Sequence, residues 1–154
     1  MKDKRQQLII EQIDRKLVPY NTIDNIIAPQ KGWLNAVRSS LNMTLQQLGN
    51  RLNITPQSAR DLEAREAAGN ITINTLRQAA QALDMKLVYG LVPKDGSIAL
   101  MIERRAEELA RKIVLRTSQS MKLENQEISP DKIEKAIQEK TDELKDKLPK
   151  YLWE

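Results

Sequence analysis

The sequence has no phenylalanine, cysteine or histidine among its 154 residues, and only 3% of its residues are aromatic. Without histidine and cysteine, the chain lacks the most common general base, the thiol nucleophile and the usual transition-metal ligands. This composition argues against an enzyme, and we expect neither a metal site nor a cofactor, although catalysis by carboxylates alone stays open. The absence of cysteine is also compatible with a reducing compartment.

Long apolar runs are missing as well. The first residues, MKDKRQQLIIEQIDRKLV, mix acids with apolar side chains, so they do not have the pattern of a signal peptide. No later run is long enough to cross a membrane. We therefore expect a cytoplasmic protein without a membrane partner.

The net charge of +4 is unevenly distributed along the chain. Residues 1–93 contain 12 basic and 8 acidic side chains, whereas residues 94–154 contain 13 of each. A basic excess confined to one half predicts nucleic-acid binding there. Surface charge of this size is also common on small soluble proteins, so the charge alone does not decide the function.

Residues 43–63, MTLQQLGNRLNITPQSARDLE, contain the clearest structural pattern in the chain. Thr44 and Gln47 have the spacing of a capping box, which predicts the start of a short helix. One apolar face of this helix is formed by three leucines at helical spacing, Leu45, Leu48 and Leu52. Asn53 then suits the left-handed backbone of a tight helix exit.

A second helix is predicted directly after this turn. Ile54 is expected to anchor the turn in the core, Thr55 is a good N-cap, and Pro56 suits the first helical position. Ala59 and Leu62 face inward, which leaves the polar side chains outside: Gln57, Ser58, Arg60 and Asp61. Two short helices joined by a tight turn, the second with polar side chains, are typical of a helix-turn-helix. The alternative is a helical hairpin in an ordinary bundle.

In a helix-turn-helix, the second helix enters the major groove of DNA. Gln57 and Arg60 are the predicted base contacts, because glutamine suits adenine and arginine suits guanine. Ser58 and Asp61 are predicted to be secondary contacts. Phosphate contacts are predicted for four further residues, Lys31, Arg38, Thr44 and Arg65.

This segment resembles the phage-repressor helix-turn-helix family of the Cro/C1 (XRE) type. The residues that carry the resemblance are Gly49, Ile54, Gln57-Ser58 and Leu62-Glu63. Two positions differ from the family: Leu45 stands where a glutamine is frequent, which affects one usual phosphate contact, and Asn53 replaces the turn glycine. The resemblance implies a lambda-repressor-like domain that binds double-stranded operator DNA as a transcriptional repressor.

Both flanks of this first segment are also predicted to be mainly helical. Residues 4–17 form a helix with one apolar face, Ile9, Ile13 and Leu17, that packs on the domain or on a second subunit. Residues 18–29 carry two prolines and form a connector. From Lys31 the DNA-binding domain begins, with Arg38 on the outer side of its first helix and Trp33 as a core anchor. The predicted inner face comprises Trp33, Leu34, Val37 and Leu41.

After the second helix of the motif, Thr72 is the expected cap of a fourth helix that carries Leu76, Ala79, Ala80 and Leu83. Residues 87–92, LVYGLV, are apolar, β-branched and aromatic, and they predict one short strand. A lone strand needs a partner for its backbone groups, either elsewhere in the chain or in a second subunit. A homodimer is the more economical alternative, because operators of this class are usually palindromic.

The composition changes after Pro93. Gly96-Ser97 predicts the start of a long helix that runs to about Leu123, with Ile98, Ile102, Leu109 and Ile113 along one side. Ser129-Pro130-Asp131 opens a last helix that Pro149 ends, and its charges mostly form a solvated face. The chain is thus expected to be mainly α, with an N-terminal helix and connector (1–30), the DNA-binding domain (31–93) and a helical arm (94–154).

Residues 120–125, SMKLEN, end the long helix and match the pattern [ST]-x-x-x-E-[GN]. Ser120 and Glu124 are four residues apart and therefore project from one helix face, and Asn125 suits the left-handed position that stops a helix. A random chain of this length contains such a pattern about one time in ten, given average residue usage. Its position between two amphipathic helices strengthens it. The alternative is an ordinary exposed glutamate near a helix end.

This pattern resembles the inhibitory motif of Fic antitoxins. In that family, an arginine of the Fic partner holds the γ-phosphate of ATP. The resemblance implies that Glu124 pairs with that arginine and prevents productive ATP binding. The chain as a whole resembles a family known as mobile mystery protein A, typically encoded beside a Fic-domain protein. The residues that carry this resemblance are Gly32-Trp33, Arg38, Gln57-Ser58, Leu87-Val88-Tyr89, Leu91-Val92-Pro93 and Met121 to Gln126.

We therefore predict the antitoxin of a Fic toxin–antitoxin pair. Its arm inhibits a Fic-domain adenylyltransferase through Ser120, Glu124 and Asn125, and its helix-turn-helix makes it a transcriptional autoregulator. The chain cannot itself be the Fic enzyme, whose motif needs histidine and phenylalanine. The alternative is a plain phage-type repressor whose C-terminal helices serve only dimerisation, and an enzyme ranks third.

Overall fold

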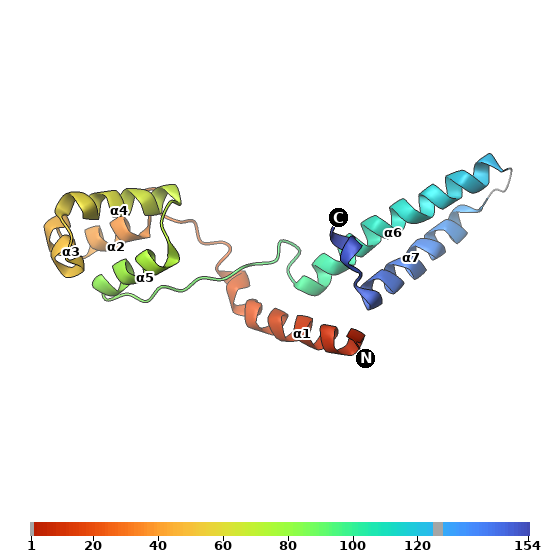
Figure 1. The fold of residues 1–154 in the computed structure, drawn as a ribbon, viewed down its shortest axis with the longest axis horizontal. Helices are drawn as coiled ribbons and strands as arrows, with labels where there is room; N and C mark the ends of the chain where they lie inside the picture. The colour runs from red at the N-terminus through yellow and green to blue at the C-terminus, as the bar shows by residue number, and fades with distance from the viewer. Residues whose placement is uncertain (1, 125–127) are drawn as a thin grey trace. The chain divides into compact units, whose positions relative to one another are not determined.

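The computed structural model describes residues 2–124 and 128–154. Over these residues the chain is mainly helical, as predicted, with seven α-helices, two short 3-10 helices and no strand (Figure 1). By its internal contacts the chain forms two compact units. One unit is Asn25–Gly90, and the other combines Met1–Asp24 with Leu91–Glu154.

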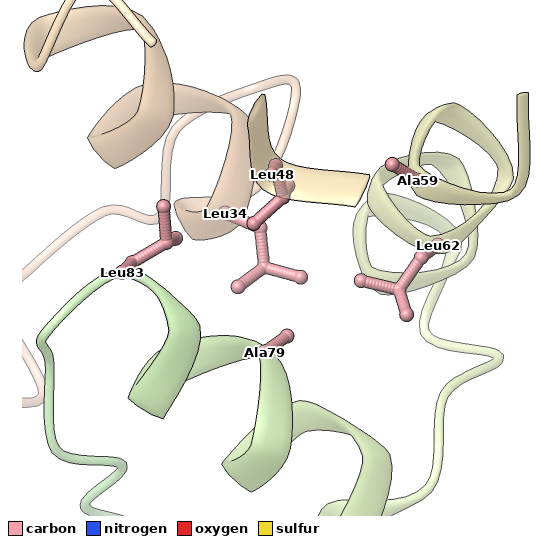
Figure 2. Packing of buried hydrophobic residues seen from close by; sticks show 6 residues of the cluster. All are labelled: Leu34, Leu48, Ala59, Leu62, Ala79 and Leu83. Carbon is pink, nitrogen blue, oxygen red and sulfur yellow. The ribbon is translucent and has the colours of Figure 1, made fainter. Parts of the chain in front are cut away.

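The unit Asn25–Gly90 contains four helices around one small core. They are α2 (Trp33–Ser40), α3 (Leu45–Leu52), α4 (Pro56–Ala68) and α5 (Ile73–Ala82). Figure 2 shows how side chains from these helices and from the end of α5 converge. The buried members of the cluster are Leu34, Leu48, Ala59, Leu62, Ala79 and Leu83.

The helix starts of this unit follow the predicted caps. Thr44 accepts a hydrogen bond from the N–H of Gln47 at 3.1 Å, and the Gln47 side chain accepts one from the N–H of Thr44 at 2.9 Å. The capping box at α3 is therefore confirmed. Thr55 and Thr72 each accept a bond from the N–H three residues further on, which confirms the predicted starts of α4 and α5.

Two predictions about α2 are wrong. Trp33 is 50% exposed and Leu41 is 52% exposed, so neither belongs to the inner face of this helix. The helix is short: Trp33 is its first residue and Leu41 follows its last, so both side chains lie at its ends rather than over the core. Leu34 and Val37 form the packed face instead.

The predicted strand at residues 87–92 is also wrong for the single chain. No strand is present in the described residues, and none of them hydrogen-bonds the backbone groups of residues 86–92. Residue pattern alone does not make a strand, because a strand also needs a second backbone to complete the ladder. This segment has the composition of a strand without that partner.

The second unit contains α1 (Lys2–Leu17), η1 (Val18–Thr22), α6 (Ile98–Leu123), α7 (Pro130–Lys147) and η2 (Lys150–Trp153). The helices α6 and α7 lie side by side as a long hairpin (Figure 1), and α1 packs against α6. The buried core of the unit consists of Ile102, Ala106, Ala110, Ile137, Leu144 and Leu152.

The boundaries of α6 agree with the prediction from the sequence. Ser97 accepts a hydrogen bond from the N–H of Leu100 at 3.1 Å, and the helix ends at Leu123. The predicted packing face of α1 differs: Ile9 and Ile13 are 43% and 38% exposed, whereas Ile10 packs against the core. The side of α1 that is buried is thus set by α6 rather than by its own apolar spacing.

Candidate nucleic-acid interface and the end of α6

The turn between α3 and α4 is unusually close. Asn53 adopts the predicted left-handed conformation, with φ 55° and ψ 40°, and the N–H of Ile54 donates to the carbonyl oxygen of Gly49 at 2.9 Å. A Cβ atom on Gly49 would lie 2.7 Å from the carbonyl oxygen of Ile54. Because no side chain fits there, glycine is what allows α3 to approach the turn and fixes where α4 begins.

One face of α4 lies in the core and the opposite face is exposed. Ala59, Leu62 and Glu63 are all buried. The predicted base-reading side chains are exposed: Gln57, Ser58, Arg60 and Asp61. Residues three and four positions apart on a helix share a face, so the start of α4 brings these four side chains together.

Hydrogen bonds organise part of this exposed face. The amide nitrogen of Gln57 donates to Asp61 Oδ1 at 3.2 Å, and Ser58 Oγ accepts a bond from Thr55 Oγ1 at 2.9 Å. Arg60 makes no hydrogen bond or ion pair within the described chain. Its guanidinium is therefore available to an external acceptor such as a guanine base or a phosphate.

The four predicted phosphate contacts lie in different surroundings. Lys31, Thr44 and Arg65 are exposed, and Arg65 lies beside Ser58 and Asp61 at a shallow hollow on α4. Arg38 differs, because only 14% of its side chain is exposed. The structure therefore directs Arg38 into the unit and not toward solvent.

Arg38 and Glu63 form a buried ion pair that joins α2 to α4. Glu63 accepts hydrogen bonds from Arg38 Nε and Nη2, and from the amide nitrogen of Asn35 at 2.9 Å. Arg38 Nη1 also donates to the carbonyl oxygen of Met43 at 2.7 Å. The sequence carried a signal for this pair, since Glu63 has the same inward spacing as Ala59 and Leu62.

A second carboxylate of α4 caps α2. Glu66 Oε1 accepts hydrogen bonds from the N–H groups of Trp33 at 2.8 Å and Leu34 at 3.4 Å. Gly32, the N-cap residue of α2, has φ 87° and no side chain that could supply this cap. Two acids of α4 thus hold α2 in place, and analysis of the sequence did not identify either of them for this role.

The predicted inhibitory residues lie at the end of α6. Ser120 and Glu124 are exposed, and Glu124 is the residue directly after the last helical residue, with φ −92° and ψ 14°. The Ser120 hydroxyl donates to the carbonyl oxygen of Arg116 at 3.2 Å, and Glu124 has no ion-pair partner in the parts of the chain that the structure describes. Asn125 lies outside the described residues.

The stretch of α6 that directly precedes Glu124 is basic. Between Glu108 and Glu124 the sequence contains no acid but four cations, Arg111, Lys112, Arg116 and Lys122. Arg111 is paired with Glu107 and Glu134, and these hydrogen bonds raise the pKa of its guanidinium, with Glu134 the larger cause. Glu124 is therefore the first acid after a positively charged stretch of α6.

Comparison of the chain with protein-family models, with curated proteins and with solved structures gives no match. Among the described helices, none is both long enough and apolar enough to cross a membrane. Within the same residues, no group of three or more acidic side chains is arranged to hold a metal ion.

Proposed function

We propose that the unit Asn25–Gly90 binds operator DNA, with α4 in the major groove as in a lambda-repressor-like helix-turn-helix. One observation carries this proposal: the exposed face of α4 collects the side chains suited to reading bases, whereas its opposite face is fixed in the core. The Gly49 contact and the Arg38–Glu63 pair hold that face rigidly. Because α4 is already fixed against the rest of its unit, no conformational entropy is lost in ordering it when it enters the major groove.

Base recognition is assigned to Gln57 and Arg60, with Ser58 and Asp61 as secondary contacts. The hydrogen bond between Gln57 and Asp61 keeps the amide in place without using all of its donors and acceptors. Phosphate contacts are assigned to Lys31, Thr44 and Arg65, which are exposed. We assign to Arg38 the role of positioning α4, because its hydrogen bonds are made inside the unit.

A binding titration tests this assignment with DNA from upstream of the protein's own reading frame. Replacing Gln57 or Arg60 by alanine should remove about 1–3 kcal/mol of discrimination at one base pair. Arg65→Ala should weaken binding to all sequences alike and lower the salt slope by about one. Arg77→Ala, an exposed cation of α5, is the matched control and should change neither quantity. Unchanged sequence preference in the Gln57→Ala/Arg60→Ala double variant would contradict the assignment.

The second part of the proposed function is inhibition of a Fic-domain adenylyltransferase by the arm. It is supported by Glu124, an exposed carboxylate without an ion-pair partner in the described chain, at the end of an otherwise basic stretch of α6. A carboxylate in this setting can accept a bidentate pair from an arginine of a partner. If that arginine normally holds the γ-phosphate of ATP, the pair prevents productive ATP binding.

The inhibitory role is tested by Glu124→Gln in a purified complex with the Fic protein. The variant keeps the size of the side chain but removes its charge, so the complex should still form while adenylylation from labelled ATP reappears. Ser120→Ala should act in the same direction with a smaller effect. The matched control is Glu139→Gln, which replaces an exposed acid of α7 and should leave the Fic protein inhibited. If adenylylation by the Glu124→Gln complex stays as low as that of the unmodified complex, the inhibitory role of Glu124 is refuted.

The runner-up function is a plain repressor whose C-terminal helices serve only dimerisation. In both functions α1, α6, α7 and η2 bury an apolar core within a single chain. Co-expression with the neighbouring reading frame separates the two functions, since only the antitoxin should yield a stable complex with a Fic protein.

A further inference from the structure

The cations of α6 fall into two groups. The three nearest the start of the helix each lie within ion-pair distance of an acid, and they are Arg104, Arg105 and Arg111. The three nearest its end have no ion-pair partner among the described residues, and they are Lys112, Arg116 and Lys122. Glu108, four positions before Lys112, is already paired with two of the arginines, and no further acid occurs before Glu124. The last part of α6 therefore carries uncompensated positive charge.

The helix dipole accounts for only one of these three charges. Cations are stabilised at the C-terminal end of a helix, but the effect is confined to the last turn. Lys122 lies in the last turn of α6, whereas Lys112 and Arg116 lie about two to three turns before it. Another reason is needed for these two.

Lys112 and Arg116 belong to a helix face that also exposes apolar surface. Positions i, i+4, i+7 and i+11 share one side of a helix, and in this part of α6 they are Lys112, Arg116, Gln119 and Leu123. All four are exposed, Leu123 to 88%, and Leu115 beside them is 43% exposed. We call these four residues the basic face. Two exposed leucines beside two unpaired cations favour a contact surface over a merely solvated one.

We propose that the basic face binds an acidic surface of the Fic-domain protein, and that it supplies affinity while Glu124 supplies the inhibition. The inference rests on the proposed function, because it names how the same partner is held. The basic face continues directly into the inhibitory residues, since one row with a spacing of four positions contains Lys112, Arg116, Ser120 and Glu124. A partner whose arginine reaches Glu124 is therefore also brought close to Arg116.

The order of charges along this row determines the chemistry of the partner. Two cations followed by an acid match a surface on which acids precede the arginine that pairs with Glu124. If the partner moved two turns towards the start of α6, its arginine would oppose Arg116, and like charges would be in contact. The basic face thus fixes the register in which Glu124 meets its arginine.

Nucleic acid and a lipid surface fit this face less well. Phosphates suit Lys112 and Arg116, but Glu124 would repel them and Leu123 would gain nothing from them. Helices that lie on anionic membranes have a broad apolar face, whereas this one offers only Leu115 and Leu123. A protein surface with acids and an apolar contact uses both kinds of side chain.

Binding of the purified full chain to the Fic protein, measured at several salt concentrations, tests the basic face. Lys112→Glu/Arg116→Glu should raise the dissociation constant at least about tenfold, mainly through slower association, and should reduce its salt dependence. The matched control is Lys16→Glu/Lys135→Glu, which makes the same change in net charge at exposed positions of α1 and α7 and should leave binding unchanged. Circular dichroism should show the same helix content in both variants, since all four positions are exposed.

Protection of a thiol provides a second test that leaves the charges unchanged. The chain contains no cysteine, so Gln119→Cys introduces one reactive thiol on the basic face. Formation of the complex should slow its reaction with a maleimide at least about tenfold, because a covered thiol is inaccessible to the reagent. Gln138→Cys, at an exposed position of α7, is the control and should react at the same rate with and without the Fic protein.

The outcomes separate this inference from the function on which it rests. Absence of any complex with the Fic protein refutes the inhibition and the role of the basic face together. Equal affinities of Lys112→Glu/Arg116→Glu and its control, or an unprotected thiol in Gln119→Cys, overturn the basic face alone. If the Glu124→Gln complex stays inhibited while the basic-face variant binds weakly, the surface stands and only the inhibitory role of Glu124 fails.

The same double variant also tests the two other occupants. Its binding to operator DNA and to vesicles that contain phosphatidylglycerol should equal that of the unmodified chain. If either binding is weakened while affinity for the Fic protein is unchanged, the basic face contacts phosphates and the proposal is overturned.

Discussion

Arg38 of α2 and Glu63 of α4 form an ion pair in the interior of the unit Asn25–Gly90, with 14% and 7% of their side chains exposed. Asn35 adds a hydrogen bond to the same carboxylate, and Arg38 reaches the carbonyl oxygen of Met43, just before α3. One guanidinium thus connects α2, the start of α3 and α4. The pair holds the proposed reading helix against the rest of its unit.

Removing one member of this pair should be strongly destabilising. Arg38→Met leaves the Glu63 charge buried without its partner, and we expect a loss of about 3–5 kcal/mol in the free energy of unfolding. The double variant Arg38→Met/Glu63→Leu should recover most of this loss, because no charge then remains buried. Urea unfolding followed by Trp33 fluorescence in a Trp153→Phe background measures it, since the chain has two tryptophans.

The matched control for this prediction is the exposed pair of Arg51 and Asp84, whose side chains are 48% and 88% exposed. Arg51→Met should change the free energy of unfolding by less than about 1 kcal/mol, because water screens such a pair. Equal effects of Arg38→Met and Arg51→Met would show that burial of the Arg38–Glu63 pair has no energetic consequence.

Gly49→Ala should destabilise the same unit although alanine is the better helix former. In an open helix this change stabilises by up to about 1 kcal/mol. Here the new Cβ would lie 2.7 Å from the carbonyl oxygen of Ile54 and 3.3 Å from backbone atoms of Thr55, so the turn must move. We expect a net loss of about 1–3 kcal/mol in urea unfolding. Asn50→Ala, at the exposed neighbouring position, should stay within about 0.5 kcal/mol.

Asp14 should contribute to the stability of the second unit by capping α6 from α1. Its two carboxylate oxygens accept the N–H groups of Ile98 at 2.7 Å and Ala99 at 3.2 Å, at the positive end of the α6 dipole. Asp14→Ala should lower the free energy of unfolding by about 0.5–2 kcal/mol, measured through Trp153 in a Trp33→Phe background. Glu11→Ala, an exposed acid of α1, serves as the control, and an equal loss there would show that the cap is unimportant.

The stability of α7 should decrease in acid through Glu143. Hydrogen bonds from Lys147 and Lys140, with Lys147 the larger cause, lower the pKa of Glu143 from 4.5 to about 2. Because the pKa is lower in the folded state, the contribution is fully present above pH 4.5 and is lost as the pH falls towards 2. The Glu143 side chain is 41% exposed, so water screens its ion pairs and we expect a small effect on stability.

Acid unfolding followed by circular dichroism tests this prediction. Glu143→Gln should show a smaller loss of stability between pH 4.5 and pH 2 than the unmodified chain. Glu139→Gln, on the same helix, should keep the full loss. Asp95, whose pKa is lowered by the hydrogen bond from Arg104, acts in the same direction in all three proteins and cancels in the comparison. Identical acid curves for the Glu143→Gln and unmodified chains would contradict the prediction.

The helix boundaries could be predicted from the sequence because they depend on residues close together in the chain. Thr44, Thr55 and Thr72 each cap a helix through the N–H three positions on, and Asn53 takes the left-handed conformation that its short side chain tolerates. The same local rule placed the start of α6 after Ser97. The side chains on the exposed face of α4 follow from helical spacing alone.

The partners of individual side chains depended on the tertiary structure. Arg38, a predicted phosphate contact, is paired with Glu63 in the structure, and Trp33 was predicted in the core but is half exposed. Residues 87–92 have the composition of a strand but no strand partner among the described residues. The sequence by itself determined where helices begin, end and turn, because those interactions span three or four residues. Only the fold decided which charges are buried and which apolar segments are left open, since these depend on residues distant in the chain.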